Sequence, residues 1–261
     1  MLTQIGNPST FRNLVVVRAQ VAQIEGGGLG HAPRRVLSTG WHSIDVALPG
    51  GGLVQGALHE MAGSGPDIEH GTTPAALIAG IAARACGQVI WIVERVPPHG
   101  PGLAGFGLAP DRVIYVVAGK NVLLAMEDSL RQAGLIAVVG EVSGRLGLTT
   151  SRRLQLVAEA SGVIAFALRR SHVHDDPMLA EPSAAMTRWH VAVLPSPAAM
   201  ARAPHVAGIG RGCWQLDLVR CRDGAPAFWI IQGCDAQGHL HPVVGLDGHA
   251  ASTDPIWRAS G

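Results

Sequence analysis

The chain has 261 residues, 48% of them hydrophobic, with a mean hydropathy of +0.26. Only 15% of the residues are charged, and this composition excludes a disordered chain because it supplies enough apolar surface for a buried core. The net charge of +1 gives no global attraction to nucleic acid or to an acidic membrane.

Neither a transmembrane helix nor a secretory signal is expected. No apolar run is long enough to cross a bilayer, and the first residues lack a basic start followed by an apolar stretch. The four cysteines form no C-x-x-C pair, which favours free thiols in a reducing compartment. We therefore expect a cytoplasmic protein without membrane contact.

In chain order, the first predicted element is a helix that ends near Ile24 and carries Leu14, Val17 and Val21 on one apolar face. A glycine-rich link follows it. A short helix is then expected over Ser43–Leu48, and a strand over Ala57–Met61 that leads into a glycine-containing loop.

The middle of the chain alternates between apolar strands and helices. Strands are predicted over 88–94, 112–118, 135–141 and 162–169, and helices over 72–85, 121–132 and 149–161. The strands are continuous apolar runs, which is typical of strands buried on both faces. This alternation predicts an α/β fold with a mostly parallel central sheet and helices on both faces. The last third reads as antiparallel, with alternation over 214–220 and a turn at RDGAPA.

The stretch GSGPDIEHGTTPAA has the rhythm of a phosphate-binding loop that opens a helix. The glycines that bound the loop are Gly63 and Gly71, and Thr73 supplies a hydroxyl of the kind that coordinates Mg²⁺. However, Thr72 stands where such a loop needs a lysine. The seven residues between the glycines also make the loop longer than a working one, and two of them are acidic.

Several segments together resemble the core of the RecA recombinase. They are STGWHSIDVALPGGGLVQGALHEMAG, Glu94 at the end of its strand, GVIAFALRR with the following MTRWHVAVLPS, and the hairpin CWQLDLVRCRDGAPAFWIIQG. The resemblance covers roughly 36–233. It is closer still to the ImuA family, RecA-like proteins related to SulA, on the strength of SRRLQLVAEASGV and RWHVAVLPS.

Three regions are expected. The resemblance implies a RecA-like core with an antiparallel C-terminal hairpin over 31–233, the apolar periodicity predicts an N-terminal helix and linker over 1–30, and the Gly-, His- and Asp-rich composition predicts a flexible tail over 234–261. The resemblance also implies an accessory adaptor of DNA-damage-induced mutagenesis. Such a protein works in translesion synthesis with ImuB and an error-prone polymerase, and RecA itself is a further candidate partner.

The same resemblance locates the acidic residues of a RecA-type ATPase site. Glu94 matches the glutamate that activates water. An aspartate that positions the metal is expected at Gly140, and Glu141 follows one residue later. Because a shift of one residue on a strand turns a side chain to the other face, we expect Glu141 to point away from the site. These changes predict a degenerate, non-hydrolysing loop with no catalytic residue, no cofactor and no metal.

Two other functions stay open. One is an inhibitor of cell division like SulA, which also acts through protein contacts. The other is a divergent RecA-like ATPase that uses Thr73, Glu94 and Glu141. An adaptor that binds nucleotide without hydrolysing it is an intermediate possibility.

Contact residues are expected in two groups. Candidates for DNA or partner contact, near the edge of the sheet where a RecA core holds DNA, are Arg152, Arg153, Arg169 and Arg170. Candidates for partner anchors are Leu14, Val17 and Val21 of the N-terminal helix and Trp257 of the tail.

Overall fold

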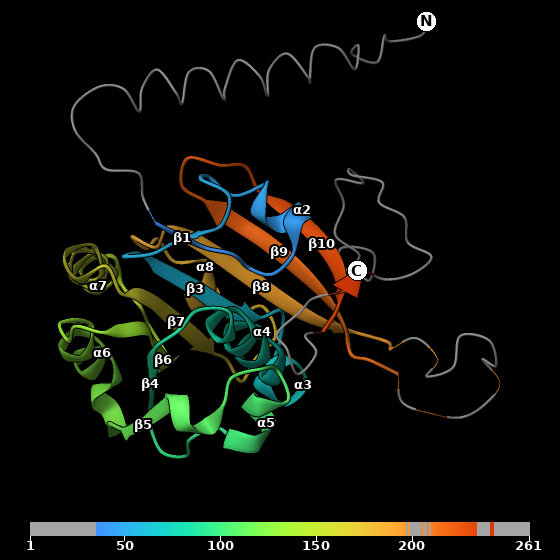
Figure 1. The fold of residues 1–261 in the computed structure, drawn as a ribbon, viewed down its shortest axis with the longest axis horizontal. Coiled ribbons are helices and arrows are strands. Elements are labelled where there is room, and N and C mark those ends of the chain that lie inside the picture. The colour runs from blue at the N-terminus through green and yellow to red at the C-terminus, as the bar shows by residue number, and fades with distance from the viewer. Residues whose placement is uncertain are drawn as a thin grey trace, which may run out of the picture. The chain divides into compact units, whose positions relative to one another are not determined.

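The computed structural model describes residues 35–196, 210–233 and 241–242, together with positions 198, 205 and 208. A nine-stranded sheet dominates this part of the chain, with the strand order β11-β10-β9-β8-β3-β7-β6-β4-β5 (Figure 1). Its strands are β3 (Leu58–Gly63), β4 (Gln88–Val93), β5 (Val113–Val117), β6 (Leu135–Ser143), β7 (Ile164–Arg170), β8 (Thr187–Leu194), β9 (Cys213–Cys221), β10 (Ala227–Gln232) and β11 (His241–Pro242). A separate antiparallel pair joins β1 (Val36–Leu37) to β2 (Leu53–Val54).

The connections are mostly helical. The helices are α2 (His42–Asp45), α3 (Asp67–His70), α4 (Thr72–Ala83), α5 (Gly100–Ala104), α6 (Val122–Leu130), α7 (Leu148–Ser161) and α8 (Pro177–Ala180), with the 3₁₀ turns η1 (Pro110–Arg112) and η2 (Gly119–Asn121). Neighbouring strands from β5 to β8 are parallel, and β8, β9, β10 and β11 are antiparallel. The predicted mostly parallel sheet with an antiparallel C-terminal hairpin is confirmed.

Each face of the sheet has its own apolar core. One core contains α4 together with side chains such as Trp91 and Phe166, and the other contains side chains of α6 and α7 such as Met126 and Leu154. Figure 1 shows α4 on one face and α6 and α7 on the other. Because successive side chains of a strand point to opposite faces, the strands between the two helical layers are apolar throughout.

Helix α4 is the central helix of the first layer. Residues 73–82 are all buried, which explains why it is apolar around its whole circumference. Its last carbonyl groups are covered by Arg112, whose guanidinium donates to the backbone oxygens of Ala82, Ala83, Ala85 and Gly87 at 2.5–3.2 Å. A positive side chain at this end also complements the helix dipole.

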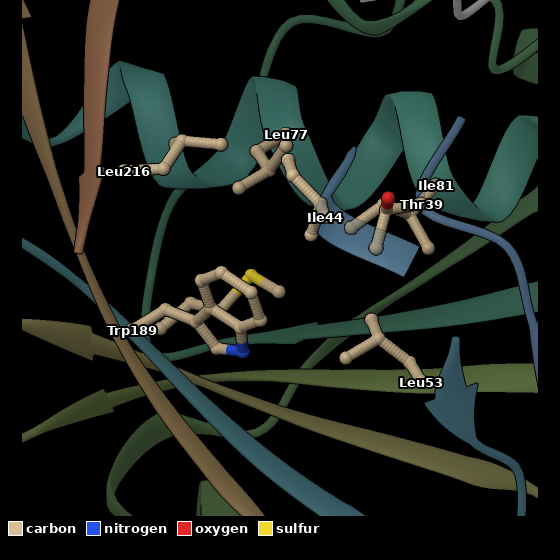
Figure 2. A pocket seen from close by; sticks show the side chains of 8 residues that line it. Thr39, Ile44, Leu53, Leu77, Ile81, Trp189 and Leu216 are labelled. Carbon is tan, nitrogen blue, oxygen red and sulfur yellow. The ribbon is translucent and has the colours of Figure 1, made fainter. Parts of the chain in front are cut away.

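A small void remains between α4 and the sheet. Figure 2 shows Leu77 and Ile81 of α4 on one side of it, and Trp189 and Leu53 on the other. Its volume of about 10 Å³ and its apolar lining leave no room for a ligand.

The expected burial of every strand on both faces is wrong for β5. This strand lies at the edge of the sheet, and Ile114 and Val117 are 49% and 61% exposed. An edge strand has a neighbour on one side only, so fewer side chains cover it. A continuous apolar run therefore predicted a strand correctly but not its place in the sheet.

Candidate functional site

The loop between Gly63 and Gly71 is folded into helix instead of forming an open cradle. After β3 ends, α3 begins at Asp67, and Gly71 has right-handed helical angles of φ −67° and ψ −20°. The Gly71 N–H donates to the Asp67 carbonyl at 2.9 Å, so α3 continues almost directly into α4. The long spacer thus becomes an extra turn in front of α4.

Backbone N–H groups of this loop already have partners within the chain. Those of Ser64 and Asp67 donate to the carbonyls of Val191 and Ser171, at 3.0 and 2.8 Å. Those of Glu69 and His70 both donate to the Pro66 carbonyl at 3.0 Å. A phosphate needs such N–H groups to point freely at it, so these four offer it no binding surface.

His70 occupies the space that the glycines leave. A Cβ atom added at Gly63 would lie 2.8 Å from the His70 Cβ, and one added at Gly65 would lie 2.8 Å from the His70 Cδ2. The ring is fixed because its Nδ1 accepts the Val193 N–H at 3.1 Å. These glycines are therefore needed for close packing against His70, whether or not a phosphate ever binds.

The two threonines have different environments. Thr72, at the position of the missing lysine, is exposed. Thr73 is buried, and its hydroxyl donates to the His70 carbonyl at 2.7 Å. The hydroxyl that was expected to face Mg²⁺ thus stabilises the start of α4.

Glu141 lies on the face of the sheet that α4 covers, so the prediction that it points away from the site is wrong. Its carboxylate accepts the Trp91 Nε1–H at 2.8 Å, and Trp91 belongs to the core around α4. Gly140 faces the other layer, where an added Cβ would lie 2.1 Å from the Met126 Sδ. The position expected to hold an aspartate therefore has no room for any side chain.

Arg170, at the end of β7, connects Glu141 to the loop. Its Nε and Nη2 lie 2.9 and 2.8 Å from the Glu141 Oε2, and its Nη1 donates to the Gly71 carbonyl at 2.6 Å. A second carboxylate, that of Asp67, lies 3.9 Å from its Nε. The guanidinium brings a fixed positive charge to the loop, but its hydrogen bonds are directed at the protein itself.

A polar cavity of about 280 Å³ lies at the carboxyl ends of β4, β6 and β7, the edge where open α/β sheets bind ligands. It is lined by Val93, Glu94, Arg95, Val96, Glu141, Ser143, Arg170 and His172. Its two carboxylates and two guanidinium groups balance, so the lining has no net charge to attract an anion. The Glu94–Arg95 pair, at 3.4 Å, is solvent-exposed and adds little stability.

The predicted contact role of Arg169 is wrong. Its side chain is 3% exposed, forms an ion pair with Glu60 at 3.2 Å, and donates to the carbonyls of Gly144 and Met178 at 2.7 and 3.4 Å. Arg170 also points inward. Consecutive residues of a strand reach opposite faces, and here both faces hold carboxylates that pair with them.

A buried polar network around Glu60 was not predicted from the sequence. Glu60 is paired with Arg169 on one side and with Arg188 at 3.5 Å on the other, and it also accepts the Ser183 hydroxyl. Arg188 donates to the Glu181 carbonyl at 2.6 Å. The signal was a glutamate within the buried strand LHEMAG, because a buried charge requires a partner.

The loops after β6 and β7 are held together at the surface as well. Arg145 and Glu181 form an ion pair at 2.7 Å. In addition, Arg169 donates to one carbonyl in each loop. Of the arginines expected to contact DNA or a partner, Arg169 and Arg170 are therefore paired within the protein, and so is Arg145 on the same edge.

The remaining predicted contact residues divide into two sets. Arg152 and Arg153 lie on the exposed side of α7, and Arg153 pairs with Glu127 of α6. The anchors Leu14, Val17, Val21 and Trp257 lie outside the described residues, as do the predicted N-terminal region over 1–30 and most of the tail over 234–261.

Within the described part of the chain, no group of three His, Cys, Asp or Glu side chains is placed to hold a metal ion. In the same residues, none of the helices is both long and apolar enough to span a membrane.

Two comparisons define the class and the family, while no family model matches the chain. Among solved structures, the RadB recombinase superposes with a TM-score of 0.57 at 16% identity, over 79% of this chain and 99% of that one. The protein therefore has a RecA-like recombinase fold. Among curated proteins, the ImuA proteins of two Caulobacter vibrioides strains are 38% identical over 220 residues, which is 80% of this chain and 88% of each relative. The chain belongs to the ImuA family.

Proposed function

We propose that this protein is an accessory adaptor of DNA-damage-induced mutagenesis that does not hydrolyse nucleotide. In this proposal it acts in translesion synthesis through protein surfaces, with ImuB as its main partner, together with an error-prone polymerase and RecA. Membership of the ImuA family supports the proposal, and so does the state of the phosphate loop.

The observation that carries the proposal is that the protein's own side chains fill the loop that would bind phosphate. A RecA-type ATPase needs a phosphate cradle, a cation and a metal-binding hydroxyl and carboxylate. Here His70 fills the cradle, the Thr73 hydroxyl binds a backbone carbonyl, and Glu141 is held by Trp91 and Arg170. Thr73 and Glu141 thus stabilise the loop and its surroundings, and Glu94 pairs with Arg95, as expected where the fold is retained for binding a partner.

Nucleotide binding without turnover is the second candidate, and the polar cavity is the observation that favours it. Glu94 and Glu141 both line this cavity beside the loop. To admit a triphosphate, however, the chain would have to break the Arg170 contacts and move His70. The ligand would then have to offset the lost hydrogen bonds, which disfavours this candidate.

Titration with a fluorescent ATP analogue and Mg²⁺ tests the site. We expect no saturable binding to the wild type up to millimolar nucleotide, and no binding to the Thr73→Ala variant. Saturable binding that Thr73→Ala abolishes would contradict a closed loop. The Arg170→Ala variant is the informative comparison, because binding that appears only there would identify Arg170 as the group that blocks the site.

The adaptor role is tested with purified ImuB from the same organism. We expect a stable complex whose affinity is unchanged by ATP, ADP or Mg²⁺. Absence of a complex would contradict the adaptor role, and an affinity that depends on nucleotide would favour the second candidate.

A further inference from the structure

Helix α7 is fixed to the body of the protein along one side. The Ser151 hydroxyl accepts the Ala184 N–H at 3.0 Å, and the Gln155 side-chain oxygen accepts the Leu58 N–H at 2.8 Å. Leu154 and Ala158 are buried in the core beneath it. The helix therefore presents its outer side as a rigid surface, which lowers the entropic cost of binding a partner.

Three residues one turn apart form a stripe on this outer side. They are Leu148, Arg152 and Leu156, spaced i, i+4 and i+8, so they line one side of the helix over about 12 Å. Both leucines are more than half exposed, at 56% and 51%. Burial of these two leucines against a partner would remove apolar surface from water, and arginine is enriched at protein interfaces.

The two neighbouring arginines of α7 differ in their pairing. Arg153 is neutralised by Glu127, which also pairs with Arg131 at 2.8 Å. Arg152 precedes Arg153 by one residue and therefore lies 100° away from it around the helix axis. It has no hydrogen bond or ion pair with any described residue. The stripe therefore carries, between two leucines, one exposed positive charge that no described residue pairs.

We propose that the Leu148–Arg152–Leu156 stripe is the docking surface for an amphipathic helix of a partner protein, with a carboxylate among its apolar side chains. The carboxylate pairs with Arg152, and the apolar side chains pack between the two leucines as the ridges of one helix pack into the grooves of another. This inference rests on the proposed adaptor function and identifies one of its binding surfaces.

A nucleic-acid surface fits the same stripe less well. Phosphate backbones are bound by several free cations, but Arg153 and Arg145 are already paired with Glu127 and Glu181. Two exposed leucines beside a single free arginine favour an apolar ligand with one negative charge.

Calorimetric titration of the full-length chain with purified ImuB tests the inference. We expect Leu156→Glu to weaken binding about tenfold or more, as for a central interface residue. Arg152→Gln should weaken it several-fold and reduce its dependence on salt. The matched controls are Leu124→Glu on α6, which is 55% exposed, and Arg131→Gln, and both should stay within about twofold of wild type.

Each result has a distinct meaning, provided that all four variants keep the thermal midpoint of the wild type. If the wild type binds and Leu156→Glu binds equally well, the docking surface is wrong and the adaptor role stands. If the wild type does not bind, both are wrong. If Arg152→Gln lowers affinity for duplex DNA and leaves the complex with ImuB unchanged, the stripe is a nucleic-acid contact and the inference is overturned.

Discussion

The guanidinium of Arg170 and the carboxylate of Glu141 lie 2.8 Å apart, on neighbouring strands, beside the loop that would hold phosphate in a RecA-type ATPase. The same guanidinium donates to the Gly71 carbonyl, which is 99 residues away in the sequence. A single side chain thus joins β6, β7 and the start of α4. These contacts connect the loop to the ends of two neighbouring strands of the sheet.

Loss of this connection should destabilise the fold. We expect Arg170→Ala to lower the free energy of unfolding by about 2–4 kcal/mol, because it leaves the largely buried Glu141 carboxylate without its partner. Urea denaturation followed by circular dichroism measures the change. Arg95→Ala is the control, since its exposed pair with Glu94 should contribute less than about 1 kcal/mol. Equal effects of the two substitutions would contradict a structural role for Arg170.

Restoring an acidic residue at Gly140 should not create a metal site. We expect Gly140→Asp to destabilise the protein by about 3 kcal/mol or more, because a Cβ there overlaps Met126 and the carboxylate would enter an apolar layer. The smaller Gly140→Ala change measures the part of this destabilisation that comes from steric overlap alone.

A double-mutant cycle with Met126→Ala tests the cause of that clash. The shortened side chain should relieve much of the cost of Gly140→Ala, although Met126→Ala alone is destabilising. Strictly additive effects of the two changes would show that Met126 is not the obstacle.

Arg112 should matter more than a partly exposed arginine usually does. Its guanidinium covers four backbone carbonyls at the end of α4, so we expect Arg112→Ala to lower the free energy of unfolding by about 2–3 kcal/mol. Arg112→Lys should recover only part of this, because an ammonium group cannot reach four acceptors at once. Thermal denaturation of both variants is the measurement, and full recovery by lysine would contradict the fork geometry.

One buried and one half-buried histidine, His59 and His190, should make the fold sensitive to mild acid. Burial lowers the pKa of His59 and of His190 from 6.5 to about 4, so both stay neutral in the folded protein where the unfolded chain takes up protons. Between pH 4 and 6.5 the unfolded state therefore binds more protons than the folded state. The free energy of unfolding is expected to fall as the pH drops from about 6.5 to 4.

Each histidine contributes up to about 3 kcal/mol to this loss, by the usual conversion of a pKa difference into free energy. Thermal midpoints measured across this range should therefore fall, and His190→Gln should reduce the slope by roughly half. His99, for which no such burial applies, supplies the control as His99→Gln. An unchanged slope in His190→Gln would contradict an imidazole that stays neutral in the folded protein.

The sequence by itself determined the class of fold. Continuous apolar strands such as QVIWIV and LIAVV, separated by helical segments, are typical of a sheet covered by helices on both faces, and this pattern is local. The missing lysine at Thr72 and the long acidic spacer were also visible without a structure.

Only the tertiary structure decided what the polar residues of the site do. Which face Glu141 occupies depends on where β6 begins its alternation, and a one-residue uncertainty reverses the answer. The partners of Arg169 and Arg170 depend on β7 lying between β3 and β6, an order that no local pattern encodes. Pairing of charges across strands is set by strand order and register. For this reason the sequence could locate the loop with Thr72 in place of a lysine, but could not show that His70 packs against its glycines or that Arg170 binds the Gly71 carbonyl.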